Sequence, residues 1–222
     1  MKSFERWTID EVEEYFGIHQ TFQHPTLETW LSASSDITDA DGRTLEELRK
    51  KAYQNIEFWN EEDLKMKFIA FLLALVPFDE ERYKGFLERT IKGTFKGEVI
   101  SGIVDYVVAT GKAEPQVPFF FLQEYKPQRR PGRDPLAQVL SAMIAARERN
   151  APQRTMYGSY VIGRQWFFLV LEENTYTISR AFDITQDDIV RVIQILRGTK
   201  RIIEQWLHAS ALGTISGSTA LK

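Results

Sequence analysis

One short and almost continuously apolar segment constrains the fold of this chain more than any other feature. Residues 118–126 read PFFFLQEYK, with charged residues only at the end. Such a segment is typical of a central strand that is covered on both faces of its sheet. The chain must therefore supply neighbouring strands on both sides of this segment and helices above and below it.

The segments on either side of the apolar strand have the composition of further strands. Residues 86–110 are rich in β-branched and aromatic residues and contain three glycines, which predicts two antiparallel strands at about 86–95 and 98–110. Downstream of a helical segment, the same criteria predict three more strands. These lie at 156–162, 165–172 and 175–182.

Helical patterns surround these strands. Asn60 is a good N-cap, three acids follow it, and apolar residues recur at helical spacing over 64–75. Helices are also predicted at 135–149, after Asp134 as N-cap, and at 186–207. The order of helix, three strands, helix, strands and helix predicts an α/β fold with a mixed central sheet flanked by helices.

The chain divides into three expected parts. Residues 1–59 form an N-terminal helical segment, residues 60–207 form the core, and residues 208–222 are small, polar and expected to be disordered.

The N-terminal segment contains two patterns of the kind that starts helices. Thr8 with Glu11, and Thr44 with Glu47, have the spacing of a capping box ahead of helical periodicity. No motif in this segment indicates a function, and it is expected to cap the core or contact a partner.

The composition excludes several kinds of site. There are no cysteines, which excludes disulfides and thiolate zinc sites, and the three histidines do not cluster. The net charge of −3 does not indicate a non-specific nucleic-acid binder, although a local basic groove is compatible with it. No apolar run is long enough to cross a membrane and no signal-peptide core is present, so a cytoplasmic protein without membrane contact is expected.

Two acids and a lysine occupy unusual positions in the predicted strands. Asp105 lies within the apolar run GIVDYVVA, and Glu124 and Lys126 end the central strand. Residues two apart on a strand point to the same face, so Glu124 and Lys126 must be neighbours. A buried acid is costly without a partner, and two acids on adjacent strands repel one another, which a divalent cation relieves.

This arrangement resembles the PD-(D/E)XK nuclease superfamily, in which an acid on one strand precedes a (D/E)-x-K motif on the next. Asp105 and Glu124-Tyr125-Lys126 match that pattern, and Val104 stands where the family often has proline. The element order over residues 61–182 is also similar. The resemblance implies a restriction-endonuclease-like core and a metal-dependent nuclease.

The resemblance also implies a set of metal ligands. Mg²⁺, or Mn²⁺, would be held by Asp105, Glu124 and the carbonyl of Tyr125. The leading helix of the family often opens with a glutamate, and here Glu61 is the best match and Glu62 the second. Glu61 would hold a second ion or a water on the metal.

Other residues are implied to act on the substrate. Lys126 would orient or help to deprotonate the attacking water and offset charge on the phosphoryl group. Some family members carry a glutamine on the helix after the motif, which makes Gln138 a candidate. Arg129, Arg130 and Arg133 follow the motif in a loop that would clamp a phosphate backbone, although such a loop is more often a solvated turn.

Three functions are compatible with these residues. The leading hypothesis is a nuclease that hydrolyses phosphodiester bonds of DNA, with RNA as the less favoured substrate, and a homodimer would suit cutting of both strands. The alternative is a catalytically inactive nuclease-fold module that binds nucleic acid or a protein partner. In the third reading, Asp105 bonds to the backbone or to Arg133, Glu124 and Lys126 form an ordinary ion pair, and the protein is structural.

Overall fold

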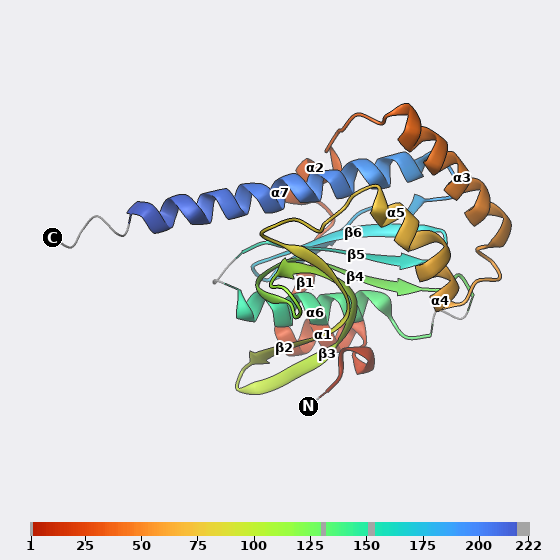
Figure 1. Cartoon of the computed structure of the whole chain (residues 1–222). Coiled ribbons are helices and arrows are strands. Elements are labelled where there is room, and N and C mark those ends of the chain that lie inside the picture. Colours follow the sequence, from red (N-terminus) through yellow and green to blue (C-terminus); the bar gives the residue numbers. More distant parts are fainter. Residues whose placement is uncertain (1, 130–131, 151–153, 217–222) are drawn as a thin grey trace.

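A mixed open sheet lies at the centre of the molecule, with helices packed on its faces (Figure 1). The computed structural model describes residues 2–129, 132–150 and 154–216 of the 222-residue chain, with side chains described up to residue 209. The predicted α/β fold with a mixed sheet flanked by helices is confirmed in these residues.

Eight strands form this sheet within the described residues. The strands are β1 (His19–Gln20), β2 (Lys84–Phe95), β3 (Glu98–Thr110), β4 (Gln116–Lys126), β5 (Met156–Ile162), β6 (Gln165–Glu172), β7 (Thr175–Ile178) and β8 (Phe182–Asp183). Their order is β1-β7-β6-β5-β4-β3-β2, and β8 pairs with β6. The β4–β5 and β1–β7 pairs are parallel and the others antiparallel. Because β4 lies between β5 and β3, it is an interior strand, as predicted.

The helices follow the predicted order with corrected bounds. They are the 3₁₀ turn η1 (Phe4–Arg6), α1 (Ile9–Phe16), α2 (Pro25–Leu31), α3 (Asp39–Asn55), α4 (Glu61–Leu64), the π-helical turn η2 (Lys65–Ile69), α5 (Ala70–Ala74), α6 (Pro135–Arg149) and α7 (Asp188–Ser216). The helix expected after Asn60 is therefore interrupted: α4, η2 and α5 run on without a break, but the middle turn is wider. The last predicted strand is also divided, into β7 and β8.

Strand β4 is covered on both faces, which explains its apolar sequence. Phe119 and Leu122 belong to a core cluster with α1 and α6, whereas Phe120 and Phe121 belong to a second cluster with α3–α5 and α7. Figure 1 shows α6 and α7 on opposite sides of the sheet. Side chains of β4 therefore reach two different cores.

The first sixty residues contribute to both of these cores. Val12 and Phe16 of α1 pack in the cluster with α6, and Trp30 of α2 and Leu45 of α3 pack in the cluster with α7. β1 pairs with β7 at the edge of the sheet. Side-chain packing thus crosses the expected boundary between residues 59 and 60.

The C-terminal helix is longer than the sequence suggests. α7 continues to Ser216, nine residues beyond the predicted helix end at residue 207, and residues 217–222 lie outside the described part, so disorder of the tail stays a prediction. Intrahelical hydrogen bonding extends through this small and polar segment, where composition alone indicates a coil. In the described part of the chain, none of the helices combines the length and apolar character needed to cross a bilayer.

Candidate functional site

The register of the sheet places the two predicted acids side by side. In the antiparallel pair of β3 and β4, Tyr106 lies opposite Gln123, and the next position along the ladder brings Asp105 level with Glu124. Residues directly opposite one another project to the same face of a sheet. Both carboxylates are buried, Asp105 at 8% exposure and Glu124 at 5%.

Both oxygens of Asp105 have partners. Oδ2 accepts a hydrogen bond from the backbone N–H of Tyr125 at 2.8 Å, and Oδ1 lies 2.7 Å from Nζ of Lys65. The bond to the backbone agrees with the structural reading of Asp105. The contact with Arg133 that this reading also allowed is not formed, because Arg133 pairs with Glu5 instead.

Lys126 joins the strand motif to the helix that precedes the sheet. Its Nζ lies 2.7 Å from Oε1 of Glu124 and 3.4 Å from Oε2 of Glu61. Glu61 is the first residue of α4, where Asn60 caps the helix. Of the two candidate glutamates, Glu61 faces the strands, while the side chain of Glu62 is 71% exposed.

Lys65 is a member of the site that the sequence analysis missed. Its Nζ bridges Asp105 and Glu61, at 2.7 Å and 2.9 Å. The available signal was the spacing of four residues from Glu61, which places the two side chains on one helix face. We call Glu61, Lys65, Asp105, Glu124 and Lys126 the carboxylate–lysine cluster.

The acids of the carboxylate–lysine cluster outnumber its lysines, and the pKa values reflect this. Burial and the charge of Asp105 raise the pKa of Glu124 above its ordinary value. Burial opposes ionisation of Glu61, but Lys65 and Lys126 outweigh it and lower the pKa of Glu61. Burial would lower the pKa of Lys126, but Glu124 raises it above the ordinary value, so Lys126 is an ammonium at neutral pH.

Tyr125, between Glu124 and Lys126, helps to fix the end of β4. Its ring is buried, its hydroxyl donates to Oε1 of Gln123, and Gln123 in turn donates to Ser159 at 2.9 Å. This chain of hydrogen bonds runs beneath the strand end and fixes β4 against β5. The role of the Tyr125 carbonyl as a metal ligand stays a prediction.

Gln138 is buried near the start of α6 but is not joined to the cluster by a hydrogen bond within the described residues. The side chain is 4% exposed, and its Oε1 has no hydrogen-bond partner there. Buried acceptors are normally satisfied, so such an atom calls for a water or a ligand. Gln138 stays a candidate for substrate binding on that ground.

The arginine loop is held by acids outside the cluster. Arg129 lies 3.4 Å from Glu57, and Arg133 pairs with Glu5 on the other side of the loop. Both side chains are more than half exposed. Arg130 lies outside the described residues. The role of Arg129 and Arg133 in clamping a phosphate backbone stays a prediction.

The donor set suits one kind of metal ion. Among the described residues there is no group of three His, Cys, Asp or Glu side chains placed to hold an ion, which argues against a dedicated protein cage. Mg²⁺ is instead bound by one or two carboxylates, and it keeps several waters. Asp105 and Glu124 match this smaller requirement, because Lys126 contacts only Oε1 of Glu124.

A cavity of about 660 Å³ adjoins the carboxylate–lysine cluster. Lys65 and Tyr125 line it together with Arg89 and Tyr106, and α5 and β2 supply apolar walls. The Lys65 ammonium is therefore accessible from a space large enough for a nucleotide-sized group.

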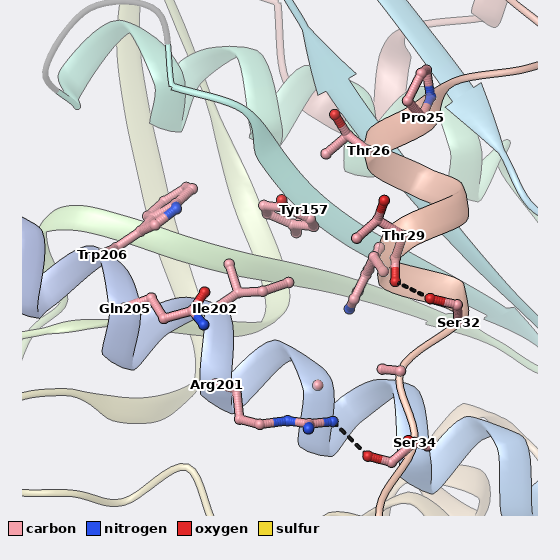
Figure 2. A pocket seen from close by; sticks show the side chains of 13 residues that line it. Pro25, Thr26, Thr29, Ser32, Ser34, Tyr157, Arg201, Ile202, Gln205 and Trp206 are labelled. Atoms are coloured by element: carbon pink, nitrogen blue, oxygen red, sulfur yellow. Dashed lines mark hydrogen bonds between the residues drawn. The ribbon is translucent and has the colours of Figure 1, made fainter.

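A second hollow lies on another part of the surface, between α2 and α7 (Figure 2). Its base contains Trp30, Tyr157 and Trp206, with Trp30 and Tyr157 in edge-to-face contact at 4.9 Å. Arg201 crosses one end and donates to the carbonyl of Ser34 at 2.7 Å. None of its lining residues belongs to the carboxylate–lysine cluster.

Comparison with known proteins assigns no family to this chain. No protein-family model matches the sequence, and no curated protein matches it.

Proposed function

We propose that this protein is a metal-dependent nuclease that hydrolyses phosphodiester bonds, with DNA as its substrate. The observation that carries the proposal is the convergence of Asp105, Glu124 and Lys126 at one strand end, with Glu61 reaching them from α4. A structural role alone gives little reason to bury the carboxylates of Asp105 and Glu124 beside the partly exposed Glu61 and two lysines, because desolvation of charges offsets their attraction.

The cluster supports a division of roles in hydrolysis. A divalent cation held by Asp105 and Glu124 would polarise the phosphate and activate water. The ammonium of Lys126 can donate a hydrogen bond to the attacking water or to a phosphoryl oxygen. Ionised Glu61, 3.4 Å from Lys126, can accept a hydrogen bond from the same water and hold it in line.

Lys126 was expected either to orient the attacking water or to help deprotonate it, and its protonated state favours the first of these roles. Because Glu124 raises its pKa, Lys126 serves better as a charged donor than as a base. The proton released by water then leaves through a carboxylate or through solvent.

A second candidate function is a binding module on the same framework without turnover. The observation that favours it is that each oxygen of Asp105 already has a protein partner, Lys65 for Oδ1 and the backbone N–H of Tyr125 for Oδ2. Such a module would recognise nucleic acid or a protein partner through the same strand end.

The test is cleavage of plasmid, single-stranded DNA and RNA in Mg²⁺ or Mn²⁺. We expect wild-type cutting, and a loss of about 10²–10³-fold in Lys126→Met and in Asp105→Asn, the size typical for removal of one stabilising group. Lys67→Met is the matched control, since Lys67 is half exposed and pairs with Asp63 on the outside of the helix.

Calcium separates the two candidate functions. Ca²⁺ occupies oxygen sites without supporting this chemistry, so binding can be measured in its presence together with its salt dependence. Binding in Ca²⁺ without cutting in Mg²⁺ or Mn²⁺ would identify a binding module. Neither binding nor cutting on any nucleic acid would remove the nuclease and the nucleic-acid-binding module, and would leave only a module that binds a protein partner.

A further inference from the structure

Lys65 has an unusual number of acidic neighbours for one ammonium group. Its Nζ lies 2.7 Å from Asp105, 2.9 Å from Glu61, 3.4 Å from Glu88 and 3.8 Å from Glu62. The Lys65 side chain is only 15% exposed, whereas Glu88 and Glu62 are largely in solvent. The two short contacts therefore place the ammonium between the Asp105 and Glu61 carboxylates.

Two irregularities of the backbone meet at this lysine. The helix widens into its π-helical turn at Lys65, and such turns are frequent at functional sites. On β2, Glu88 adopts a φ of 49°, a conformation that residues with a side chain rarely take. The register places Glu88 level with Asp105, since Leu87 and Arg89 flank the equivalent positions of the ladder.

We propose that the ammonium of Lys65 takes the place of a second metal ion, so that the site binds a single divalent cation. This inference rests on the proposed function, and it specifies how the carboxylates are used. The single cation binds at Asp105 and Glu124, while Glu61 pairs with Lys65 and Lys126 and is not a metal ligand. The expectation that Glu61 holds a second ion is thereby replaced.

Geometry gives the first reason. In sites with two metals the ions lie about 3.5–4 Å apart, and a carboxylate is shared between them. Here the shared ligand would be Asp105, but its Oδ1 already contacts Lys65 at 2.7 Å. The other ligand of a second ion would be Glu61, and its Oε1 contacts the same ammonium at 2.9 Å.

Charge balance gives the second reason. Once a bound cation has displaced the proton that the raised pKa of Glu124 favours, the three carboxylates and two ammonium groups of the carboxylate–lysine cluster carry one net negative charge. One divalent cation and one phosphodiester group bring this total to neutrality. A second divalent cation would leave two positive charges in a site where charge is poorly solvated, which is unfavourable.

The place of Lys65 also gives it access to the substrate. It lines the cavity beside the cluster together with Arg89 and Tyr106. A phosphate oxygen entering from that cavity meets an ammonium that Asp105 and Glu61 hold in place. Lys65 can thus supply on one side of the phosphate the positive charge that a second metal supplies elsewhere.

The experiment counts Mn²⁺ ions bound to the purified protein by calorimetric titration and electron paramagnetic resonance. We expect one ion per wild-type chain and the signal of an isolated Mn²⁺. Lys65→Met is expected to bind two ions and to show the spin coupling of a close pair. Lys65→Arg, which keeps the positive charge, is the matched control and should bind one.

The outcomes separate this inference from the proposed function. Two coupled ions in the wild type, or a single ion in folded Lys65→Met, would overturn the role of Lys65 and leave a metal-dependent nuclease intact. No Mn²⁺ on the wild type at all would overturn both. If Lys65→Met does not fold, the wild-type count and its spectrum still decide between one ion and two.

Discussion

Charged side chains have different partners in two regions of the molecule. In the carboxylate–lysine cluster, charged groups are buried at the end of the sheet, and acids outnumber lysines. At the junction of α7 with residues 30–41, arginines donate to backbone carbonyls of the adjoining loop. These contacts are Arg191 to Leu31, Arg197 to Asp36 and Arg201 to Ser34, at 2.7–2.8 Å.

The difference indicates that the junction contributes mainly to stability, whereas the carboxylate–lysine cluster keeps an excess of acidic groups. At the junction the guanidinium groups lie near solvent and donate to carbonyl oxygens, and Arg197 also pairs with Asp41, so no buried carboxylate is left in excess and the aromatic residues beneath can pack closely. In the cluster burial, together with the charge of Asp105, raises the pKa of Glu124. That electrostatic cost is relieved when a cation binds, which is what a binding site requires.

The largest expected effect on stability lies in the junction. Trp30 is 2% exposed, packs edge-on against Tyr157 at 4.9 Å, and donates to the hydroxyl of Thr199 at 3.0 Å. Trp30→Ala should lower the free energy of unfolding by about 3–5 kcal/mol, the cost of a large cavity. Urea denaturation followed by circular dichroism measures this.

Phe22→Ala is the control for that change, because Phe22 is also an aromatic residue of the N-terminal segment but is 88% exposed. It should alter the free energy of unfolding by no more than about 0.5 kcal/mol. Equal losses in the two variants would show that the junction is not a packed region. Mn²⁺ affinity should be unchanged in folded Trp30→Ala, because the junction shares no residue with the cluster.

The second largest effect on stability is expected for Lys65→Met, which removes a positive charge from the carboxylate–lysine cluster. Lys65→Met leaves three carboxylates with Lys126 alone, so it should destabilise the protein by about 2 kcal/mol, within the range for lost hydrogen bonds to charged groups. Adding Mn²⁺ should restore more stability to this variant than to the wild type. Thermal unfolding with and without Mn²⁺ checks both expectations, and equal shifts would contradict an excess of negative charge.

A smaller effect at the junction depends on pH. Asp41 accepts from the backbone N–H of Thr38 at the start of α3, and it also contacts Arg197 at 3.0 Å. The Thr38 bond, followed by Arg197, lowers the pKa of Asp41. Its carboxylate therefore stabilises the fold above its ordinary pKa, and this stability is lost as the pH falls through the lowered value.

Asp41→Asn should accordingly cost about 1 kcal/mol at neutral pH, the usual contribution of a helix cap. The difference from the wild type should shrink in acid, as the pH falls through the lowered pKa of Asp41 and the wild-type carboxylate becomes protonated. Urea denaturation at neutral pH and in acid provides the measurement. A difference that grows in acid would mean that the Asp41 charge is not what stabilises α3.

The fold was largely predictable because local patterns and long-range packing agree in it. Strand β4 is apolar because two cores cover it, and the capping box of Thr8 and Glu11 does start α1. The second capping prediction, at Thr44 and Glu47, was wrong. The box is formed by Thr38 and Asp41, six residues earlier than the predicted pair, and α3 continues through Gly42.

The site was predictable only in the part that depends on strand geometry. The alternation of side chains along β4 places Glu124 beside Lys126, and the hairpin brings Asp105 level with them. Lys65 was not predictable in this way, because its contact with Asp105 depends on how α4 lies against the sheet. The same holds for Arg133, which pairs with Glu5 of a distant segment.

The smallest expected effect is the sharpest test of the comparison between the two regions. Asp105 is buried and has two close partners, so breaking its ion pair would ordinarily cost about 3–5 kcal/mol. If acids are in excess, however, Asp105→Asn leaves two carboxylates with two lysines, and Lys65 keeps Glu61 at 2.9 Å. The asparagine oxygen can still accept from Tyr125, so the change should stay within about 1 kcal/mol. A loss as large as that of Trp30→Ala would mean that Asp105 is a structural residue, and that the cluster stabilises the fold in the same way as the junction does.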